Sequence, residues 1–98
     1  MPPININSAI TEYSKVASNA AEAVTLIAEH GGRLGLMIYN GSTAILYCRI
    51  DGNATTSDYS FAIPANSLYE MPQGYFTDKV TGIWASENGS AFITQIRK

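Results

Sequence analysis

The segment LGLMIYNGSTAILYCRI, residues 34–50, decides the fold class of this chain. It holds two apolar runs, residues 34–39 and 44–50, which are separated by a turn that begins Asn40-Gly41. Asn before Gly is the pair best able to adopt the positive φ angles of a tight hairpin turn, so residues 34–50 predict a β-hairpin. Arg49 is expected to face solvent, and alternation then places the other side chains of this strand on the inner face: Ala44, Leu46, Cys48 and Ile50.

Two shorter strands follow in the middle of the chain. Residues 58–63 alternate between apolar and polar side chains and end at a proline, which places three side chains inward: Tyr59, Phe61 and Ile63. Residues 68–71 are short and end at Pro72, as is typical of an edge strand.

The last part of the chain predicts a second hairpin, over residues 80–96. Its two strands, residues 80–85 and 91–96, flank the turn pair Asn88-Gly89. Regular turns between short strands predict a mostly β fold, a small antiparallel β-sandwich or barrel of about 7–8 strands.

The first third of the chain carries two competing signals. Apolar residues between Ala9 and Ala28 recur at helical spacing. Against one continuous helix, residues 24–27 are rich in β-branched side chains that suit a strand. We expect a strand over about residues 23–29 and an arm or short helix over residues 7–20. The predicted division is an N-terminal arm, residues 1–22, extended or a short helix, followed by a β-sandwich domain, residues 23–98.

The composition suits a domain that is partly covered by a partner. Of the 98 residues only 14% are charged, well below the roughly 25% usual for soluble domains. The six basic and eight acidic residues are scattered, so no basic stripe predicts binding to nucleic acid. No apolar run approaches the ~20 residues of a membrane-spanning helix, and the start lacks a secretory signal. The single cysteine, Cys48, fits a reducing cytoplasm.

The residues that could carry catalysis have no partners at useful spacing. The one histidine, His30, lies in a predicted exposed turn, and Cys48 lies on an apolar strand face, so a zinc site or a Cys–His pair cannot be assembled. The carboxylates show neither calcium-loop nor glycosidase spacing, and the glycines form no phosphate loop. We therefore expect no enzyme activity, no cofactor and no metal site.

Four aromatic residues near one another in the sequence are candidates for binding: Tyr69, Tyr75, Phe76 and Trp84. One interpretation is a protein contact surface, because tyrosine and tryptophan are enriched in interface hot spots. A second is a platform on which sugar rings stack. A third, for Trp84, is the central aromatic residue of a sandwich core.

Five motifs occur in an order that resembles a module of small tailed-bacteriophage proteins. They are RLGLMIYN (residues 33–40), STAILY (42–47), TTS (55–57), YEMP (69–72) and GIWAS (82–86), and a final strand follows them. The resemblance covers about residues 24–96 and implies a β-sandwich component of the virion, made in the host cytoplasm.

The role that this resemblance implies is a capsid decoration (cement) protein, a homo-oligomer such as a trimer, bound to the major capsid protein or another virion protein. A tail, neck or fibre-attachment module is the alternative, and a carbohydrate-binding module is the second alternative. The arm is expected to reach a neighbouring subunit, which adds four residues to the candidate interface: Pro2, Pro3, Ile4 and Ile6.

Overall fold

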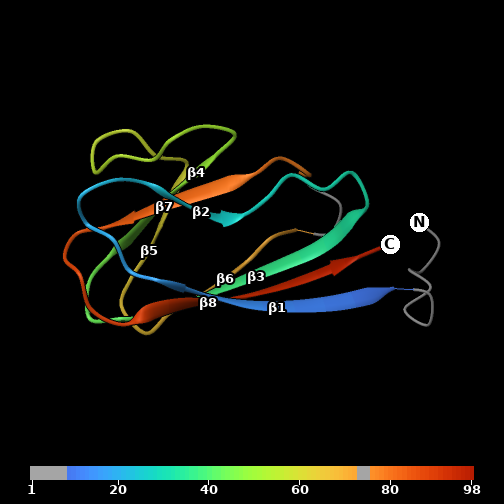
Figure 1. The fold of residues 1–98 in the computed structure, drawn as a ribbon, viewed down its shortest axis with the longest axis horizontal. Coiled ribbons are helices and arrows are strands. Elements are labelled where there is room, and N and C mark those ends of the chain that lie inside the picture. Colours follow the sequence, from blue (N-terminus) through green and yellow to red (C-terminus); the bar gives the residue numbers. More distant parts are fainter. Residues whose placement is uncertain (1–8, 73–75) are drawn as a thin grey trace.

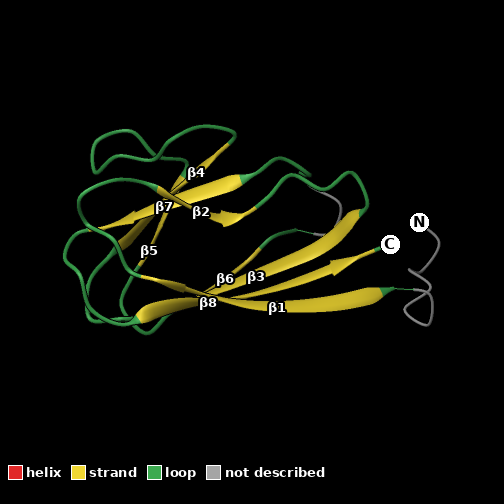
Figure 2. Ribbon diagram, in the orientation of Figure 1, coloured by secondary structure: helices red, strands yellow, loops and turns green. Residues whose placement is uncertain are grey.

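The computed structural model describes residues 9–72 and 76–98, and these form two antiparallel sheets packed face to face (Figures 1 and 2). The strands are β1 (Ile10–Ala17), β2 (Val24–Ile27), β3 (Arg33–Gly41), β4 (Leu46–Ile50), β5 (Phe61–Ile63), β6 (Leu68–Glu70), β7 (Val80–Trp84) and β8 (Ser90–Arg97). The first sheet has the order β1-β8-β3-β6 and the second sheet has the order β2-β7-β4-β5. The predicted β-sandwich is confirmed, and the described residues include no helix, hence none that could cross a membrane.

The chain changes sheet at almost every connection. Only β4 and β5 are consecutive strands of the same sheet, and residues 51–60 join them. Eight strands in two sheets of this order make a jelly roll, in which neighbouring strands of a sheet come from distant parts of the sequence. In the lower layer of Figure 1, accordingly, the first strand, β1, lies beside the last, β8.

The core lies between the two sheets. Its largest completely buried side chains come from both layers: Trp84, Ile38, Leu46, Ile63, Ile93 and Val80. Gly82 lets the second sheet pack closely here, because an added Cβ would lie 2.8 Å from side-chain carbons of both Leu26 and Leu46. No buried polar side-chain atom of the described residues lacks a hydrogen-bond partner.

The hairpin predicted over residues 34–50 is wrong, because β3 and β4 belong to different sheets. A buried asparagine holds the corner between them. The Asn40 Nδ2 group donates to the carbonyl oxygens of Ala44, Ile63 and Pro64 at 2.8, 2.9 and 3.2 Å. Its Oδ1 atom accepts from Ser42 Oγ at 2.8 Å and Trp84 Nε1 at 3.3 Å. These bonds direct the chain across the sandwich instead of back along β3.

The hairpin predicted over residues 80–96 is also wrong, because β7 lies in the second sheet and β8 in the first. Of the predicted turn pair, Gly89 alone has a positive φ, +68°. A Cβ at Gly89 would collide with the carbonyl oxygen of Gly41. The glycine is therefore needed both for its left-handed conformation and for the close approach of the two sheet corners.

The N-terminal region departs from the predicted arm. Residues 10–17 form β1, which pairs with β8 along its whole length, so the arm or short helix expected over residues 7–20 is wrong for this part. The sheet therefore begins before the predicted boundary at residue 22. The helical spacing gave a wrong prediction here because β8, a long strand distant in sequence, provides backbone hydrogen-bond partners for residues 10–17. The strand expected near residues 23–29 is confirmed as β2.

Most of the predicted inward faces are confirmed. Ala44, Leu46 and Cys48 are buried and Ile50 is half-buried. Phe61 and Ile63 also point inward, whereas Tyr59 precedes β5 and is 45% exposed. The prediction for β6 is confirmed, because this strand lies at the edge of the first sheet.

Candidate interaction surface

The outer face of the first sheet carries a row of large side chains across all four strands. In the ladders Phe92 lies opposite Lys15 on one side and Tyr39 on the other, and Tyr39 lies opposite Leu68. Leu68, Phe92 and Tyr39 are 53%, 47% and 37% exposed. The rings of Tyr39 and Phe92 are tilted, with centroids 6.3 Å apart, and Lys15 Nζ lies 5.8 Å from the Phe92 centroid. These contacts confirm that the row shares one face.

A second row runs beside the first. It lies two residues away from the first row on each strand. In it Thr94 lies between Tyr13 and Met37, and Met37 lies opposite Glu70. Tyr13 is 79% exposed. We call the two rows the aromatic face and define it by its five large uncharged side chains: Tyr13, Met37, Tyr39, Leu68 and Phe92. Its charged residues, Lys15 and Glu70, lie on opposite edge strands, so the centre of the face is uncharged.

The outer face of the second sheet is covered by the chain's own loop, residues 51–60, at the top of Figure 1. The Asp58 carboxylate accepts from Arg49 at 2.6 Å, and the Tyr59 ring lies 4.8 Å from that of Tyr47. Thr81 Oγ1 accepts from the Ala54 N–H at 3.0 Å. As a result all five residues of β7 are buried, whereas β8 alternates between buried and accessible side chains. Among the described residues, no comparable segment covers the outer face of the first sheet.

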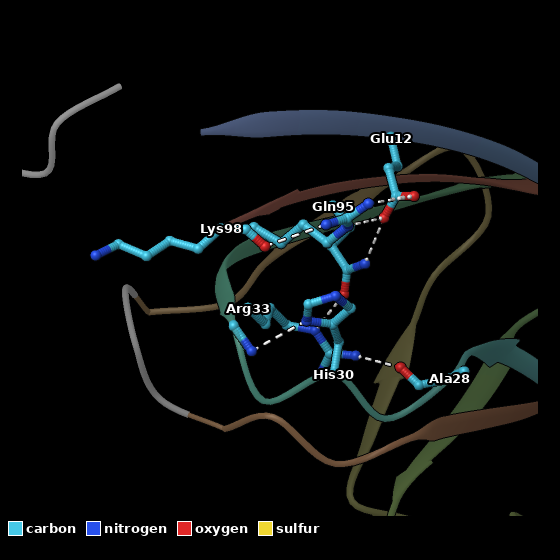
Figure 3. Close-up of polar contacts among 8 residues, drawn as sticks. Glu12, Ala28, His30, Arg33, Gln95 and Lys98 are labelled. Carbon is cyan, nitrogen blue, oxygen red and sulfur yellow. Dashed lines mark hydrogen bonds and ion pairs between the residues drawn. The ribbon is translucent and has the colours of Figure 1, made fainter. Parts of the chain in front are cut away.

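One end of the sandwich is closed by a buried arginine (Figure 3). Arg33 is 3% exposed, and its guanidinium donates to Gln95 Oε1 at 2.7 Å and to the carbonyl oxygens of Asp78 and Ala28 at 2.8 Å. Burial lowers the pKa of Arg33, and the negative charge of Asp78 opposes that effect. These three hydrogen bonds all go to backbone or amide oxygens of the fold, so the cluster has a structural role.

The network continues from Arg33 to the edge strand β1. Gln95 Nε2 donates to Glu12 Oε1 at 3.0 Å, and Arg97 Nε donates to the same oxygen at 2.7 Å. The hydrogen bond from Arg97, with a further one from Gln95, lowers the pKa of Glu12. Together these bonds fasten the start of β1 to β8 and, through Gln95, to the buried Arg33.

The aromatic residues singled out from the sequence lie mainly inside the molecule. Trp84 is completely buried, so it is a core residue and offers no surface to a partner. Phe76 is also buried, with its ring centroid 5.7 Å from the Arg33 guanidinium carbon. Tyr69 is half-buried and stacks on Phe61 with centroids 3.9 Å apart, joining the edges of the two sheets. Burial excludes Trp84 as a sugar platform, and Phe61 covers one face of the Tyr69 ring.

Five further residues of the candidate interface lie outside the described residues, and their role stays a prediction: Pro2, Pro3, Ile4, Ile6 and Tyr75. The aromatic face was not predicted, although β3 carries a signal for it. The run in β3, from Leu34 to Tyr39, is apolar at successive positions. A strand of that kind is apolar on both faces, and the core can cover only one of them.

His30 and Cys48, the two residues considered for catalysis, are both part of the packed fold. His30 is half-buried, and its Nδ1 atom accepts from the backbone N–H of Gly32 at 3.0 Å. Cys48 is completely buried, and burial raises the pKa of its thiol far above the ordinary range. Within residues 9–72 and 76–98, no three His, Cys, Asp or Glu side chains are grouped so that they could hold a metal ion.

Comparison of the chain with protein-family models, with curated proteins and with solved structures gave no match.

Proposed function

We propose that this chain is a non-catalytic structural protein of a tailed phage, a decoration protein that binds the capsid exterior through the aromatic face. The observation that carries the proposal is the contrast between the two sheets. Residues 51–60 cover the two central strands of the second sheet, β4 and β7, whereas the first sheet exposes Tyr13, Tyr39, Leu68 and Phe92 together. Exposed apolar side chains gathered on one face of a small domain mark a surface that a partner covers.

Composition and fold support this proposal. A chain with 14% charged residues has little with which to solvate its surface. Jelly rolls occur in viral capsid proteins and in lectins. That is a fold-level analogy, and it adds to the phage resemblance of the sequence motifs without deciding the function.

Binding to capsids tests the proposal. The purified chain is mixed with capsids of the phage that encodes it, and bound protein is measured after sedimentation. We expect Tyr39→Glu and Phe92→Glu each to weaken binding by about tenfold or more, because a buried unpaired carboxylate opposes association. Ile45→Glu is the matched control, since Ile45 is 42% exposed but lies outside the aromatic face. A wild-type chain that does not bind, or a control that loses as much affinity, would contradict the proposal.

The number of copies in each particle separates this role from a tail or neck role. A decoration protein is present on the order of hundreds of copies, whereas tail and neck rings hold about six to twelve. Quantitative mass spectrometry of purified particles gives the count. The lower number would overturn the decoration role.

A further inference from the structure

The four edge strands of the sandwich differ in how well they are protected from pairing with another chain. β5 and β6 have only three residues each, and β2 has four with a register shift. β1 has eight residues in continuous register with β8. Short and irregular edges resist strand addition, whereas a long regular edge is a template for it. β1 is therefore the one edge of the described sandwich built for pairing.

The backbone groups that β1 offers can be identified from its ladder. The Ser18 N–H donates to the Gly89 carbonyl oxygen at 3.1 Å, continuing the register in which Ala17 lies opposite Ser90. Because backbone groups alternate along a strand, the even-numbered residues of β1 bond to β8. The odd-numbered residues, among them Thr11, Tyr13 and Lys15, direct their N–H and C=O groups to the outer edge. No strand of the described residues pairs with that edge.

We propose that β1 pairs antiparallel with β1 of a second copy, with Tyr13 of the two copies opposite each other at a two-fold axis. The axis is perpendicular to the sheet, so residues on the same face of the sheet lie opposite one another. The Tyr13-centred register places Ile10 opposite Val16, Thr11 opposite Lys15, and Glu12 opposite Ser14. About six backbone hydrogen bonds close the pair.

Charge and apolar contacts favour this register over those with the two-fold axis at a nearby residue of β1. A two-fold centred on Glu12 or on Lys15 places like charges opposite each other, which is destabilising. A two-fold centred on Ser14 places Glu12 opposite the apolar Val16. The Tyr13-centred register instead pairs Ile10 with Val16 and covers Ile10 and Tyr13, which are 46% and 79% exposed in the single chain. The sequence of β1 is therefore complementary to β1 of a second copy of this chain.

The proposed pairing changes the surface that the protein presents. The first sheets of the two copies become one continuous sheet, and both aromatic faces lie on the same side of it. The interface is isologous and closes at two copies. It therefore builds a dimer, in contrast to the trimer considered from the phage resemblance, and it does not depend on which partner the aromatic face binds.

Cysteine cross-linking tests the register. Residues opposite each other in a hydrogen-bonded pair have Cα atoms about 5.5 Å apart, within the range of a disulfide. We expect Tyr13→Cys to form a covalent dimer when oxidised glutathione accepts the two electrons. Thr11→Cys alone should not, whereas a mixture of Thr11→Cys and Lys15→Cys should. The native Cys48 is buried and does not compete. Cross-linking of Thr11→Cys as readily as Tyr13→Cys would overturn the register.

The oligomeric state of the unmodified chain tests the pairing itself. We expect sedimentation equilibrium to give a dimer for the wild type and a monomer for Lys15→Pro. Proline at this position removes an outward N–H but none that bonds to β8, so the sandwich should keep its circular dichroism spectrum. A wild-type chain that stays monomeric at high micromolar concentration would overturn the proposal, even if it binds capsids.

Discussion

Asn40 shows how a single side chain can redirect the chain at a corner. It lies completely buried where β3 ends, and it bonds to the segment before β4, to the end of β5 and to the core residue Trp84. A buried amide with this many partners is specific in its geometry, because a misfolded corner would leave several polar groups without hydrogen bonds.

We expect Asn40→Ala to lower the free energy of unfolding by about 2–4 kcal/mol, because the Ala44 and Ile63 carbonyls and the Trp84 indole lose a buried partner. Urea denaturation followed by Trp84 fluorescence measures the change. Asn53→Ala, at an exposed position in the loop of residues 51–60, is the control and should change stability by less than about 0.5 kcal/mol. Equal effects of the two substitutions would contradict the role assigned to Asn40.

Gly89 offers a second test at the scale of one residue. Its left-handed φ of +68° and its contact with Gly41 leave no room for a side chain. We expect Gly89→Ala to destabilise the fold by at least about 2 kcal/mol. Gly31→Ala is the matched control, because nothing lies within 4 Å of an added Cβ there. Thermal unfolding of both variants should show a lower midpoint for Gly89→Ala alone, and an unchanged midpoint would be evidence against the close approach.

At the scale of elements, β1 is held differently from the other long strands. It buries none of its side chains completely, and only Val16 packs against the core. Its attachment therefore depends on the ladder with β8 and on the bonds from Gln95 and Arg97 to Glu12.

Protonation of Glu12 should loosen β1. The hydrogen bond from Arg97 lowers the pKa of Glu12 in the folded state below its ordinary value of 4.5. A lowered folded-state pKa means that this stabilisation is fully present above the unfolded-state value and is lost as the pH falls through the folded-state value. We expect the stability difference between the wild type and Glu12→Gln to shrink as the pH is lowered below 4.5. Denaturation at several pH values checks this.

The control for this experiment is Glu29→Gln, an exposed carboxylate outside the network. Its stability difference from the wild type should not follow the same pH dependence. A difference for Glu12→Gln that stays constant with pH would show that the Arg97 contact does not stabilise the folded chain.

The sequence predicted the strands better than their connections. Alternation identified β4 and β5, and short runs bounded by prolines or turn residues identified β3 and β6 to β8. The turn pairs Asn40-Gly41 and Asn88-Gly89 predicted hairpins that the structure does not form. Local turn chemistry carries no information about which sheet the next strand joins. β1 was missed because its partner β8 lies at the other end of the chain. The apolar run of β3 indicated a second apolar face, but which residues of the other strands join it depends on register, which a single sequence does not reveal.

At the scale of the whole molecule, the two faces of the sandwich are unequal. Residues 51–60 fold over the second sheet through Arg49–Asp58 and Tyr47–Tyr59, and the first sheet has no equivalent cover among the described residues. A domain of 98 residues gains stability from any partner that buries apolar surface. The bare face and the long edge of β1 lie on the same sheet, so both proposed contacts use one side of the molecule.

Cryo-electron microscopy of the intact phage particle tests the central claim most directly. We expect density for this sandwich on the outside of the capsid, with the aromatic face of Tyr39, Leu68 and Phe92 against the shell and residues 51–60 toward solvent. A shell without this density, or a sandwich seated with the aromatic face toward solvent, would contradict the account.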